Sequence, residues 1–382
     1  MDSNRIRGML EGLVLGDVLG APYEQFKYST VLEPYDGLIH DYSDLFIRDQ
    51  YNSPQLKPGI IPERLKLMKH FVRFENSWKF GIAGQWTDDT EMTLILANSL
   101  IRNQGFNRND LILEYEKWAN VTSTIGFNTK NLFKGVTTIN GYENRATKVF
   151  GVPVMNENTS LVRYLSADEL QSNGSLMRAS SLFAFKDMNI VFGDCNLTNP
   201  NDYNRECSLL YTGALRLLGE GHQPFEIFYF LETLAKMDQN KQFFQQIKNG
   251  GQTRIVSGNH KGWIGNAFYL SMLVLAHLGT NIKDFSNVLN FIIPLGGDTD
   301  TNACIVSALA GMYFGHNIMI TDYKIVRNLN IIYQALPGRK TTTVGKYIFD
   351  SYYRPDYLIE YVRNIGDTSE KLLQLYRKNF ES

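Results

Sequence analysis

The segment GMLEGLVLGDVLG, residues 8–20, places a glycine at every fourth position: 8, 12, 16 and 20. At about 100° per residue, these glycines form one slowly drifting stripe without side chains along a predicted helix. Each glycine costs roughly 1 kcal/mol of helix stability relative to alanine, so the stripe needs a packing or active-site reason. It therefore predicts either a helix that another backbone approaches very closely or a helix that lines a site.

Outward from this segment, the composition indicates a large helical protein. The chain has 382 residues, of which 43% are hydrophobic and 20% charged, which excludes a disordered chain and a small disulfide scaffold. Convincing strand-like alternation is confined to 148–155 and 190–197. Helical spacing of apolar residues is much more extensive and predicts an all-α fold. It covers residues 91–102, 205–219, 225–236, 265–278 and 302–314.

The charge balance and the apolar runs exclude several classes of protein. With 38 basic and 39 acidic residues, the chain lacks the basic surplus of a nucleic-acid binder. Residues 262–282 and 301–321 lack charged residues, but both contain Asn, Ser and His, which favours buried helices over membrane spans. Glu11 and Asp17 interrupt the first apolar run, so it is not a signal peptide. The three cysteines form no CxxC pair, and we expect a cytoplasmic protein.

Two similar acidic clusters each stand directly before an apolar helix. Thr87–Thr90 reads TDDT, and Asp298–Thr301 reads DTDT after the turn signal Gly296-Gly297. A helix start commonly carries one Asp or Thr, because the side-chain oxygen caps free N–H groups and the helix dipole favours negative charge. Capping therefore explains one residue of each cluster. It does not explain two carboxylates and two hydroxyls in each.

The acidic clusters indicate a site for a hard cation. Carboxylates crowded near a core repel one another unless a positive charge neutralises them, and neither cluster contains Arg, Lys or His. Ligand sets made only of oxygen favour Mg²⁺, Mn²⁺ or Ca²⁺. If the two helix starts face each other, their carboxylates could hold a pair of ions, with Asp17 and Glu24 adding oxygens. The alternative is two acidic helix caps far apart in space.

Two further segments were considered as sites. The dipeptide His40-Asp41 is similar to a metal-binding pair of HD phosphohydrolases, but no His precedes it, which favours a chance occurrence. The turn Asn173-Gly174-Ser175, followed by Arg178, offers backbone N–H groups, hydroxyls and a guanidinium to a phosphate. An ordinary helix start is the alternative interpretation of this turn.

Taken together, these segments resemble the ADP-ribosylglycohydrolase family. The matching blocks occur in the family's order, and the pair WTDDT and GGDTDT is specific. The blocks are residues 8–24, 86–92, 172–178 and 296–303. The resemblance implies a single all-α, orthogonally packed domain over 1–382. Its family-like core would cover about 1–320, with a divergent insertion at about 30–80 and a divergent C-terminal part at 321–382.

The resemblance also implies the residues of the site and two bound Mg²⁺ (or Mn²⁺) ions. Many members have a histidine where this chain has Asn199, and asparagine can form hydrogen bonds but cannot act as an acid or base near neutral pH. The implied metal ligands are Thr87, Asp88, Asp89, Asp298, Asp300 and Thr301. The implied catalytic residues are Glu24, Asp89 and Asp300, and the implied substrate-binding residues are Asn173, Gly174, Ser175 and Asn199.

The activity that follows from the resemblance is hydrolysis of a glycosidic bond to ADP-ribose. The partner would be an ADP-ribosylated protein or a small ADP-ribose conjugate, and we expect neither a nucleic acid nor a membrane. Two other functions stay open: a catalytically weak or inactive member that binds ADP-ribose or is structural, and a Mg²⁺-dependent nucleotide phosphohydrolase. The retention of all six metal-motif positions and of Glu24 favours the enzyme.

Overall fold

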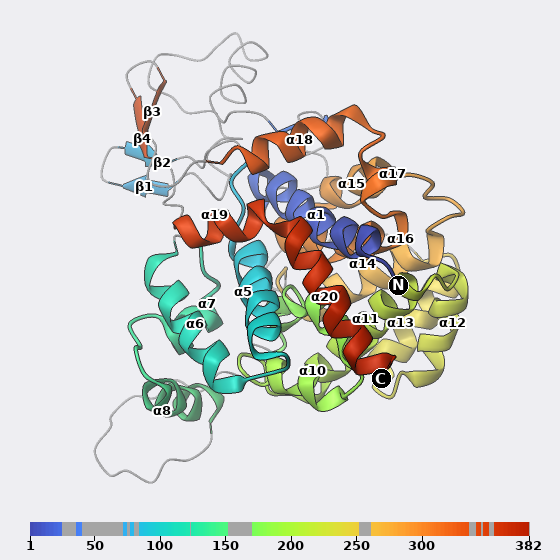
Figure 1. The fold of residues 1–382 in the computed structure, drawn as a ribbon, viewed down its shortest axis with the longest axis horizontal. Coiled ribbons are helices and arrows are strands. Elements are labelled where there is room, and N and C mark those ends of the chain that lie inside the picture. Colours follow the sequence, from blue (N-terminus) through green and yellow to red (C-terminus); the bar gives the residue numbers. More distant parts are fainter. Residues whose placement is uncertain are drawn as a thin grey trace.

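Helices make up the body of the protein, as predicted (Figure 1). A computed structural model describes residues 1–24, 36–39, 84–122, 124–151, 170–251, 261–335 and 355–381, and the backbone of four short strands. His40 and Asp41 lie outside the described residues. The strands, which the sequence did not predict, form two antiparallel hairpins that lie beside each other at one edge of the helical body. They are β1 (Val72–Phe74) with β2 (Ser77–Lys79), and β3 (Thr341–Val344) with β4 (Tyr347–Asp350).

The glycine stripe lets two helices touch through their backbones. It lies on α1 (Ser3–Gly20), which packs antiparallel against α16 (Thr299–Phe314). A methyl group added at any of the four glycines would lie within 2.6 Å of a carbonyl oxygen of α16, a distance that atoms in contact do not reach. The pairs are Gly8 with Gly311, Gly12 with Ser307, Gly16 with Ala303, and Gly20 with Thr299.

The antiparallel packing brings the end of α1 to the start of α16. The short 3-10 turn η1 (Ala21–Tyr23) continues α1, and η4 (Ile293–Leu295) precedes α16. Gly20, the last residue of α1, contacts the backbone of Thr299, the first residue of α16. The glycine stripe therefore serves both roles that the sequence offered as alternatives: it lets another backbone approach closely, and it brings α1 to the start of α16.

The other helices pack around this pair. α14 (Ile264–His277) and α15 (Phe285–Ile292) contact α16, while α20 (Ile365–Phe380) contacts both α1 and α5 (Asp88–Asn103). The remaining helices are α6 (Arg108–Val121), α7 (Phe127–Phe133), α8 (Ile139–Phe150), η2 (Asn173–Ser175), η3 (Ala179–Ala184), α10 (Met188–Cys195), α11 (Asp202–Glu220), α12 (Pro224–Leu234), α13 (Asp238–Lys248), α17 (His316–Met319), α18 (Tyr323–Tyr333) and α19 (Asp356–Arg363).

The helices predicted from apolar spacing are confirmed, since the five segments correspond to α5, α11, α12, α14 and α16. The strand prediction for 190–197 is wrong, because most of this segment belongs to α10. Val191 and Cys195 are four residues apart and both buried, so they form the inner face of that helix. Residues 152–155 of the other strand candidate lie outside the described residues. Among the described helices, none combines the length and the apolar character needed to cross a membrane.

The substitution Gly12→Ala tests the backbone contact away from the acidic residues. The added methyl group would lie 2.4 Å from the carbonyl oxygen of Ser307, so the two helices must move apart. We expect a loss of about 1–3 kcal/mol in the free energy of unfolding, measured by urea denaturation. In the control Gly213→Ala, within α11, the nearest atom is a methyl of Leu231 at 3.6 Å, and stability should be equal or higher. Equal unfolding midpoints for the two variants would contradict the packing argument.

Candidate active site

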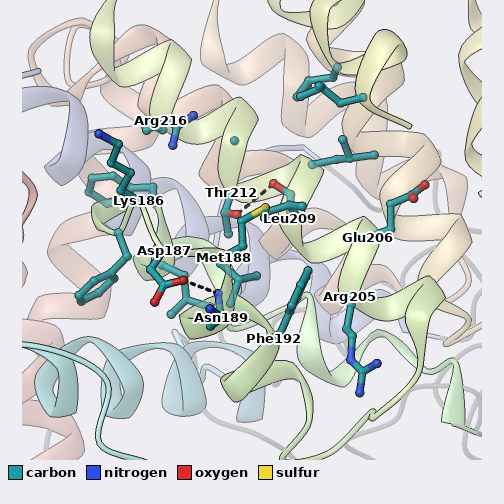
Figure 2. Close-up of a pocket in the computed structure, with 18 of the residues that line it drawn as sticks. Lys186, Asp187, Met188, Asn189, Phe192, Arg205, Glu206, Leu209, Thr212 and Arg216 are labelled. Carbon is teal, nitrogen blue, oxygen red and sulfur yellow. Dashed lines mark hydrogen bonds between the residues drawn. The ribbon is translucent and has the colours of Figure 1, made fainter. Parts of the chain in front are cut away.

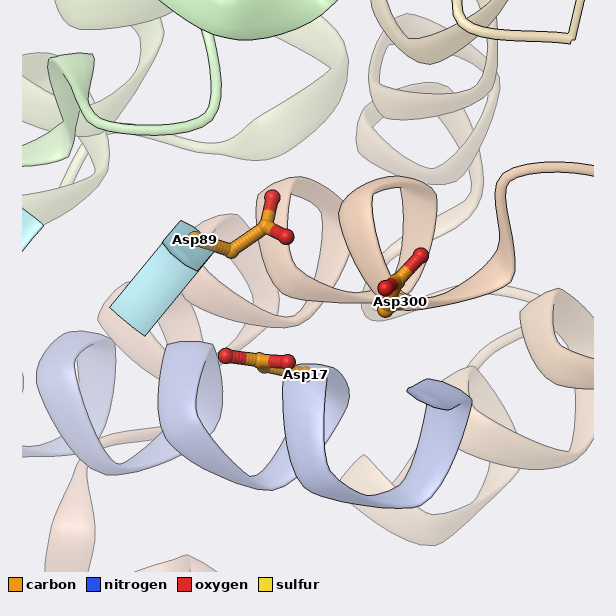
Figure 3. A group of neighbouring side chains, drawn as sticks. All are labelled: Asp17, Asp89 and Asp300. Atoms are coloured by element: carbon orange, nitrogen blue, oxygen red, sulfur yellow. The ribbon is translucent and has the colours of Figure 1, made fainter. Parts of the chain in front are cut away.

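Three aspartates from three helices lie together. Asp17 belongs to α1, Asp89 to α5 and Asp300 to α16, and Figure 3 shows their carboxyl groups beside one another. One oxygen of each lies within 4.8 Å of an oxygen of the other two. The three residues are at most 2% exposed, so their carboxyl groups are almost completely removed from water.

A second acidic group shares Asp300 with the first. Glu24, Asp298 and Asp300 each offer an oxygen, and these oxygens also lie within 4.8 Å of one another. The acidic clusters at 87–90 and 298–301, more than 200 residues apart in sequence, therefore meet in the fold. We call the five carboxyl groups of the two groups the acidic centre: Asp17, Glu24, Asp89, Asp298 and Asp300.

Asp17 holds the start of α5 against α1. Its carboxylate accepts hydrogen bonds from the backbone N–H and the hydroxyl of Thr87, at 2.9 and 2.8 Å. It also accepts the N–H and the hydroxyl of Thr90, at 3.1 and 2.6 Å. The N–H groups at a helix start have no partner within the helix, so Asp17 caps α5 from a neighbouring helix. This contact fixes the position of Asp89 relative to α1 and α16.

Asp89 faces both threonines that the sequence predicted as metal ligands. Its Oδ2 accepts the hydroxyl of Thr87 at 2.9 Å and that of Thr301 at 3.3 Å. Its Oδ1 is buried and has no hydrogen-bond partner among the described residues. The neighbouring Asp88 accepts the N–H of Gly126, at the start of α7, through Oδ2 at 2.9 Å. A buried carboxylate oxygen without a donor is unfavourable unless a cation or a proton satisfies it.

Two glycines turn the chain into the start of α16. Gly296 and Gly297 have φ angles of +73° and +79°, in the left-handed region that glycine adopts without steric cost. Asp298 follows at the N-cap position, but its side chain does not cap the helix. Its Oδ2 instead accepts a hydrogen bond from Nδ2 of Asn173 at 2.7 Å. Capping therefore does not account for Asp298.

Glu24 enters the acidic centre from the turn that follows α1. The hydroxyl of Thr299 donates to the carbonyl oxygen of Tyr23 at 3.2 Å, which ties this turn to the start of α16. Glu24 is 3% exposed, and its Oε1 accepts a hydrogen bond from Nζ of Lys261 at 2.7 Å. The carboxylate is therefore buried beside a lysine ammonium.

Burial and mutual repulsion raise the pKa of Asp17 and of Asp89. Removal from water raises the pKa of Asp17 to about 7, although the hydrogen bond from Thr90 acts in the opposite direction. Burial, followed by the charges of Asp17 and Asp300, raises the pKa of Asp89 well above its usual value. The acidic centre therefore needs protons or a cation to be buried at neutral pH.

The residues present fit a hard divalent cation. Both groups of the acidic centre consist of carboxyl groups, and Thr87 and Thr301 add hydroxyl oxygens. Mg²⁺, Mn²⁺ and Ca²⁺ prefer such ligands. The unsatisfied Oδ1 of Asp89 points to a missing positive partner. Because Asp300 belongs to both groups, a pair of ions with one shared carboxylate is compatible with the geometry.

The predicted substrate-binding turn lies against the acidic centre. Asn173 is 7% exposed and contacts Asp298, as described above. Its backbone N–H donates to the carbonyl oxygen of Gly262 at 2.9 Å. Gly174 is partly exposed and follows directly. Of the turn, Asn173 therefore contacts the acidic centre directly.

The side chains of Ser175 and Arg178 point into the protein. The hydroxyl of Ser175 is fully buried and accepts a hydrogen bond from Asn204 at 2.9 Å. Arg178 is also fully buried; its Nε pairs with the carboxylate of Asp194 at 3.1 Å, and its NH1 donates to the carbonyl oxygen of Gly174 at 2.6 Å. The guanidinium therefore holds the shape of the turn, and it is not available to a phosphate.

Asn199 lies beneath the same turn. It is fully buried, and its Nδ2 donates to the carbonyl oxygen of Leu170 at 2.8 Å and to the hydroxyl of Ser172 at 3.0 Å. Its Oδ1 accepts the hydroxyl of Thr198 at 2.7 Å. These contacts use both ends of the amide. A direct contact of Asn199 with substrate stays a prediction, while the bracing of Ser172 is a feature of the structure.

Sequence reasoning missed two residues of the site and underrated a third. Thr90 stands within the TDDT motif, and a hydroxyl directly after two aspartates at a helix start was the sequence signal for it. Lys261 lies in no motif and is 237 residues from Glu24, so no sequence signal links the two. Asp17 was considered only as an additional oxygen donor, but it also caps α5.

A groove of about 890 Å³ lies elsewhere, among η3, α10, α11 and α12 (Figure 2). Its walls carry mainly apolar side chains such as Phe192 and Leu209, and it includes no residue of the acidic centre. Of its acidic residues, Asp187 caps α10, Glu206 accepts the N–H groups before α13, and Asp202 pairs with Arg205 at 2.7 Å. The groove therefore lacks a group of carboxylates free for chemistry, and the acidic centre is the candidate active site.

Comparisons with known proteins indicate the family of this chain. The sequence profile described as ADP-ribosylglycohydrolase matches residues 2–325. A protein of Acanthamoeba polyphaga mimivirus, L543, whose name assigns it provisionally to the ADP-ribosyl glycohydrolases, is 25% identical over 342 residues. That alignment covers 82% of this chain and 88% of the viral protein.

A solved structure titled as an ADP-ribosylglycohydrolase-related protein complex has a similar fold. It matches with a TM-score of 0.56 and 18% identity over 99% of both chains. The profile match includes both acidic clusters, the turn at Asn173 and the glycine stripe. This chain belongs to the ADP-ribosylglycohydrolase family.

Proposed function

We propose that this protein hydrolyses the glycosidic bond between ADP-ribose and a modified protein side chain, or a related conjugate, and releases ADP-ribose. One observation carries the proposal. Two groups of three carboxyl groups each, which have Asp300 in common, lie together beside the turn of Asn173. A family of glycohydrolases and a buried acidic centre are consistent with cleavage at the anomeric carbon of a ribose.

The proposed metal ligands come from the starts of α5 and α16. The expected ions are Mg²⁺ or Mn²⁺, two in number, and when bound they would supply Lewis-acid chemistry that orients the ribose hydroxyls and lowers the pKa of a water. The hydroxyls of Thr87 and Thr301 lie beside Asp89, which supports their place in this set. The ligands are Thr87, Asp88, Asp89, Asp298, Asp300 and Thr301.

The chain's own residues would provide proton transfer, substrate binding and support of the substrate-binding turn. Glu24, Asp89 and Asp300 are the proposed catalytic residues, and a carboxylate among them accepts the proton of the attacking water. Asn173 and Gly174 would contact the nucleotide end of the substrate, because Asn173 contacts the acidic centre and Gly174, which follows it, is partly exposed. Ser175 and Asn199 would act by holding the turn in shape, since both side chains are fully buried.

Asp89→Asn and Asp300→Asn test the catalytic assignment. Each removes one negative charge from the acidic centre with little change of shape, so we expect loss of turnover with the fold intact. The control is Asp238→Asn, because the side chain of Asp238 is 90% exposed on α13. The assay measures release of ADP-ribose from arginine- and serine-linked substrates, with and without EDTA.

The products separate the proposed activity from its alternatives. Free ADP-ribose together with unmodified protein supports a glycohydrolase, whereas inorganic phosphate or AMP would indicate a phosphohydrolase. Binding without any product would indicate an inactive member. Wild-type rates in either active-site variant, or release that EDTA does not affect, would remove these residues or the metal from the mechanism.

The raised pKa values predict how Asp89→Asn changes stability with pH. In the metal-free protein, burial raises the folded-state pKa of Asp17 to about 7, and the pKa of Asp89 is also raised well above the value near 4 of an unfolded Asp. The folded state therefore binds more protons above pH 4, and stability falls as the pH rises through these pKa values. The asparagine variant lacks one such group, so in EDTA it should become more stable than wild type by on the order of 1 kcal/mol per pH unit between about pH 5 and 7.

Divalent ions should reverse the order of stability of wild type and Asp89→Asn. Thermal denaturation of both proteins at pH 5 to 8, in EDTA and in Mn²⁺, is the measurement. With Mn²⁺ at pH 8, wild type should be the more stable protein, because its ligand is deprotonated and binds the ion. A stability difference that is the same at every pH, or that Mn²⁺ does not change, would contradict the electrostatic account.

A further inference from the structure

Lys261 places a positive charge at one side of the acidic centre. Its Nζ donates to Oε1 of Glu24 at 2.7 Å, and Glu24 belongs to the group with Asp298 and Asp300. Within the described ranges of the chain, Lys261 is the only Lys, Arg or His that forms an ion pair with a carboxyl group of the acidic centre. In the other group, Asp17 and Asp89 lie among hydroxyl and N–H donors, and neither forms an ion pair with a Lys, Arg or His of the described residues.

The fold holds Lys261 in this place. The neighbouring backbone pairs with the substrate-binding turn, because the N–H of Asn173 donates to the carbonyl oxygen of Gly262 and the N–H of Ile264 to that of Gln171. The indole of Trp263 donates to the side chain of Gln171 at 3.0 Å. The backbone on the C-terminal side of Lys261 is thus tied to the turn, and the lysine is not an unconstrained surface residue.

The backbone beside Lys261 also approaches the second acidic group. A methyl group added at Gly262 would lie 3.4 Å from Oδ2 of Asp298. Lys261 therefore emerges within reach of both Glu24 and Asp298. Its ammonium neutralises Glu24, a carboxyl group that lies within 4.8 Å of the oxygens of Asp298 and Asp300, where an ion would bind.

The ammonium of Lys261 and a divalent ion at Asp298 and Asp300 would both lie beside Glu24, and they repel each other strongly because both are cations in a largely buried site. Lys261 is able to leave, because its side chain is 29% exposed whereas that of Glu24 is 4% exposed. Lysine carries its charge on a flexible four-carbon stem and exchanges partners readily. The same carboxylate can therefore be neutralised alternately by the lysine and by an ion.

We propose that Lys261 is an internal counter-ion that competes with the second metal ion. With one ion bound at Asp89 and Asp300, the ammonium of Lys261 neutralises Glu24. It must release Glu24 before the second ion binds at Asp298 and Asp300, beside Glu24. The second ion therefore binds more weakly than the first, and Lys261 sets the difference. This inference rests on the proposed metal centre and adds the regulation of its occupancy.

The test compares the binding of Mn²⁺ to wild type, Lys261→Met and Lys261→Arg. Binding is measured by electron paramagnetic resonance of free Mn²⁺ and by calorimetry. Methionine keeps most of the stem length without the charge, and arginine keeps the charge. We expect two binding steps in wild type, with a second step that Lys261→Met tightens by about tenfold or more. The first step should change much less, and Lys261→Arg should resemble wild type.

Lys248→Met is the matched control. Lys248 also forms a 2.7 Å ion pair with a glutamate, Glu232, and its side chain is likewise 29% exposed, but it lies at the end of α13. This variant should bind both ions as wild type does.

One outcome would overturn the role of Lys261 alone, and another would overturn the proposed metal centre as well. If Lys261→Met binds the second ion no more tightly than wild type, or if Lys248→Met gives the same gain, the counter-ion role is wrong while the metal-dependent hydrolase stands. If wild type binds no Mn²⁺ at all, the proposed metal centre fails and the inference fails with it. Circular dichroism of each variant establishes that the fold is retained in these comparisons.

Discussion

The backbone contact between α1 and α16 positions the acidic residues of the site. Glycines at 8, 12, 16 and 20 give up helix stability, and in return the two helices approach until their backbones touch. Because the helices are antiparallel, Asp17 and Glu24 at the end of one meet Asp298 and Asp300 at the start of the other. α5 joins this pair through the hydrogen bonds that Thr87 and Thr90 donate to Asp17. The geometry of the acidic centre is thus a consequence of helix packing.

The same packing creates an electrostatic problem that a cation resolves. Asp17 and Asp89 are buried beside other carboxyl groups, and their pKa values are raised because removal from water and repulsion favour the protonated forms. The starts of α5 and α16 supply N–H groups and favourable dipoles, which offset part of this cost. The unsatisfied Oδ1 of Asp89 and the ammonium of Lys261 on Glu24 are two signs of the same demand for positive charge.

Much of the fold followed from short-range patterns, and the errors have physical causes. Apolar spacing predicted the long buried helices, and the glycine stripe predicted a close approach but not its partner. Small residues at 299, 303, 307 and 311 of α16 repeat at the same spacing and were a signal for that partner. The segment 190–197 is too short for its apolar pattern to distinguish the period of a strand from that of a helix. In the structure it is mostly helical, and Val191 and Cys195 are buried on one face of α10.

The candidate site was predictable where a motif carries it and not elsewhere. The paired TDDT and DTDT clusters pointed to their residues, because capping could explain only part of each cluster. Lys261 and the bracing role of Asn199 depend on contacts between distant segments, which leave no local pattern. The most direct test of the account is a crystal structure with Mn²⁺ and anomalous diffraction. We predict two peaks flanking Asp300, one toward Asp89 and one toward Asp298; at saturating Mn²⁺, peaks elsewhere or an acidic centre without manganese would contradict the account.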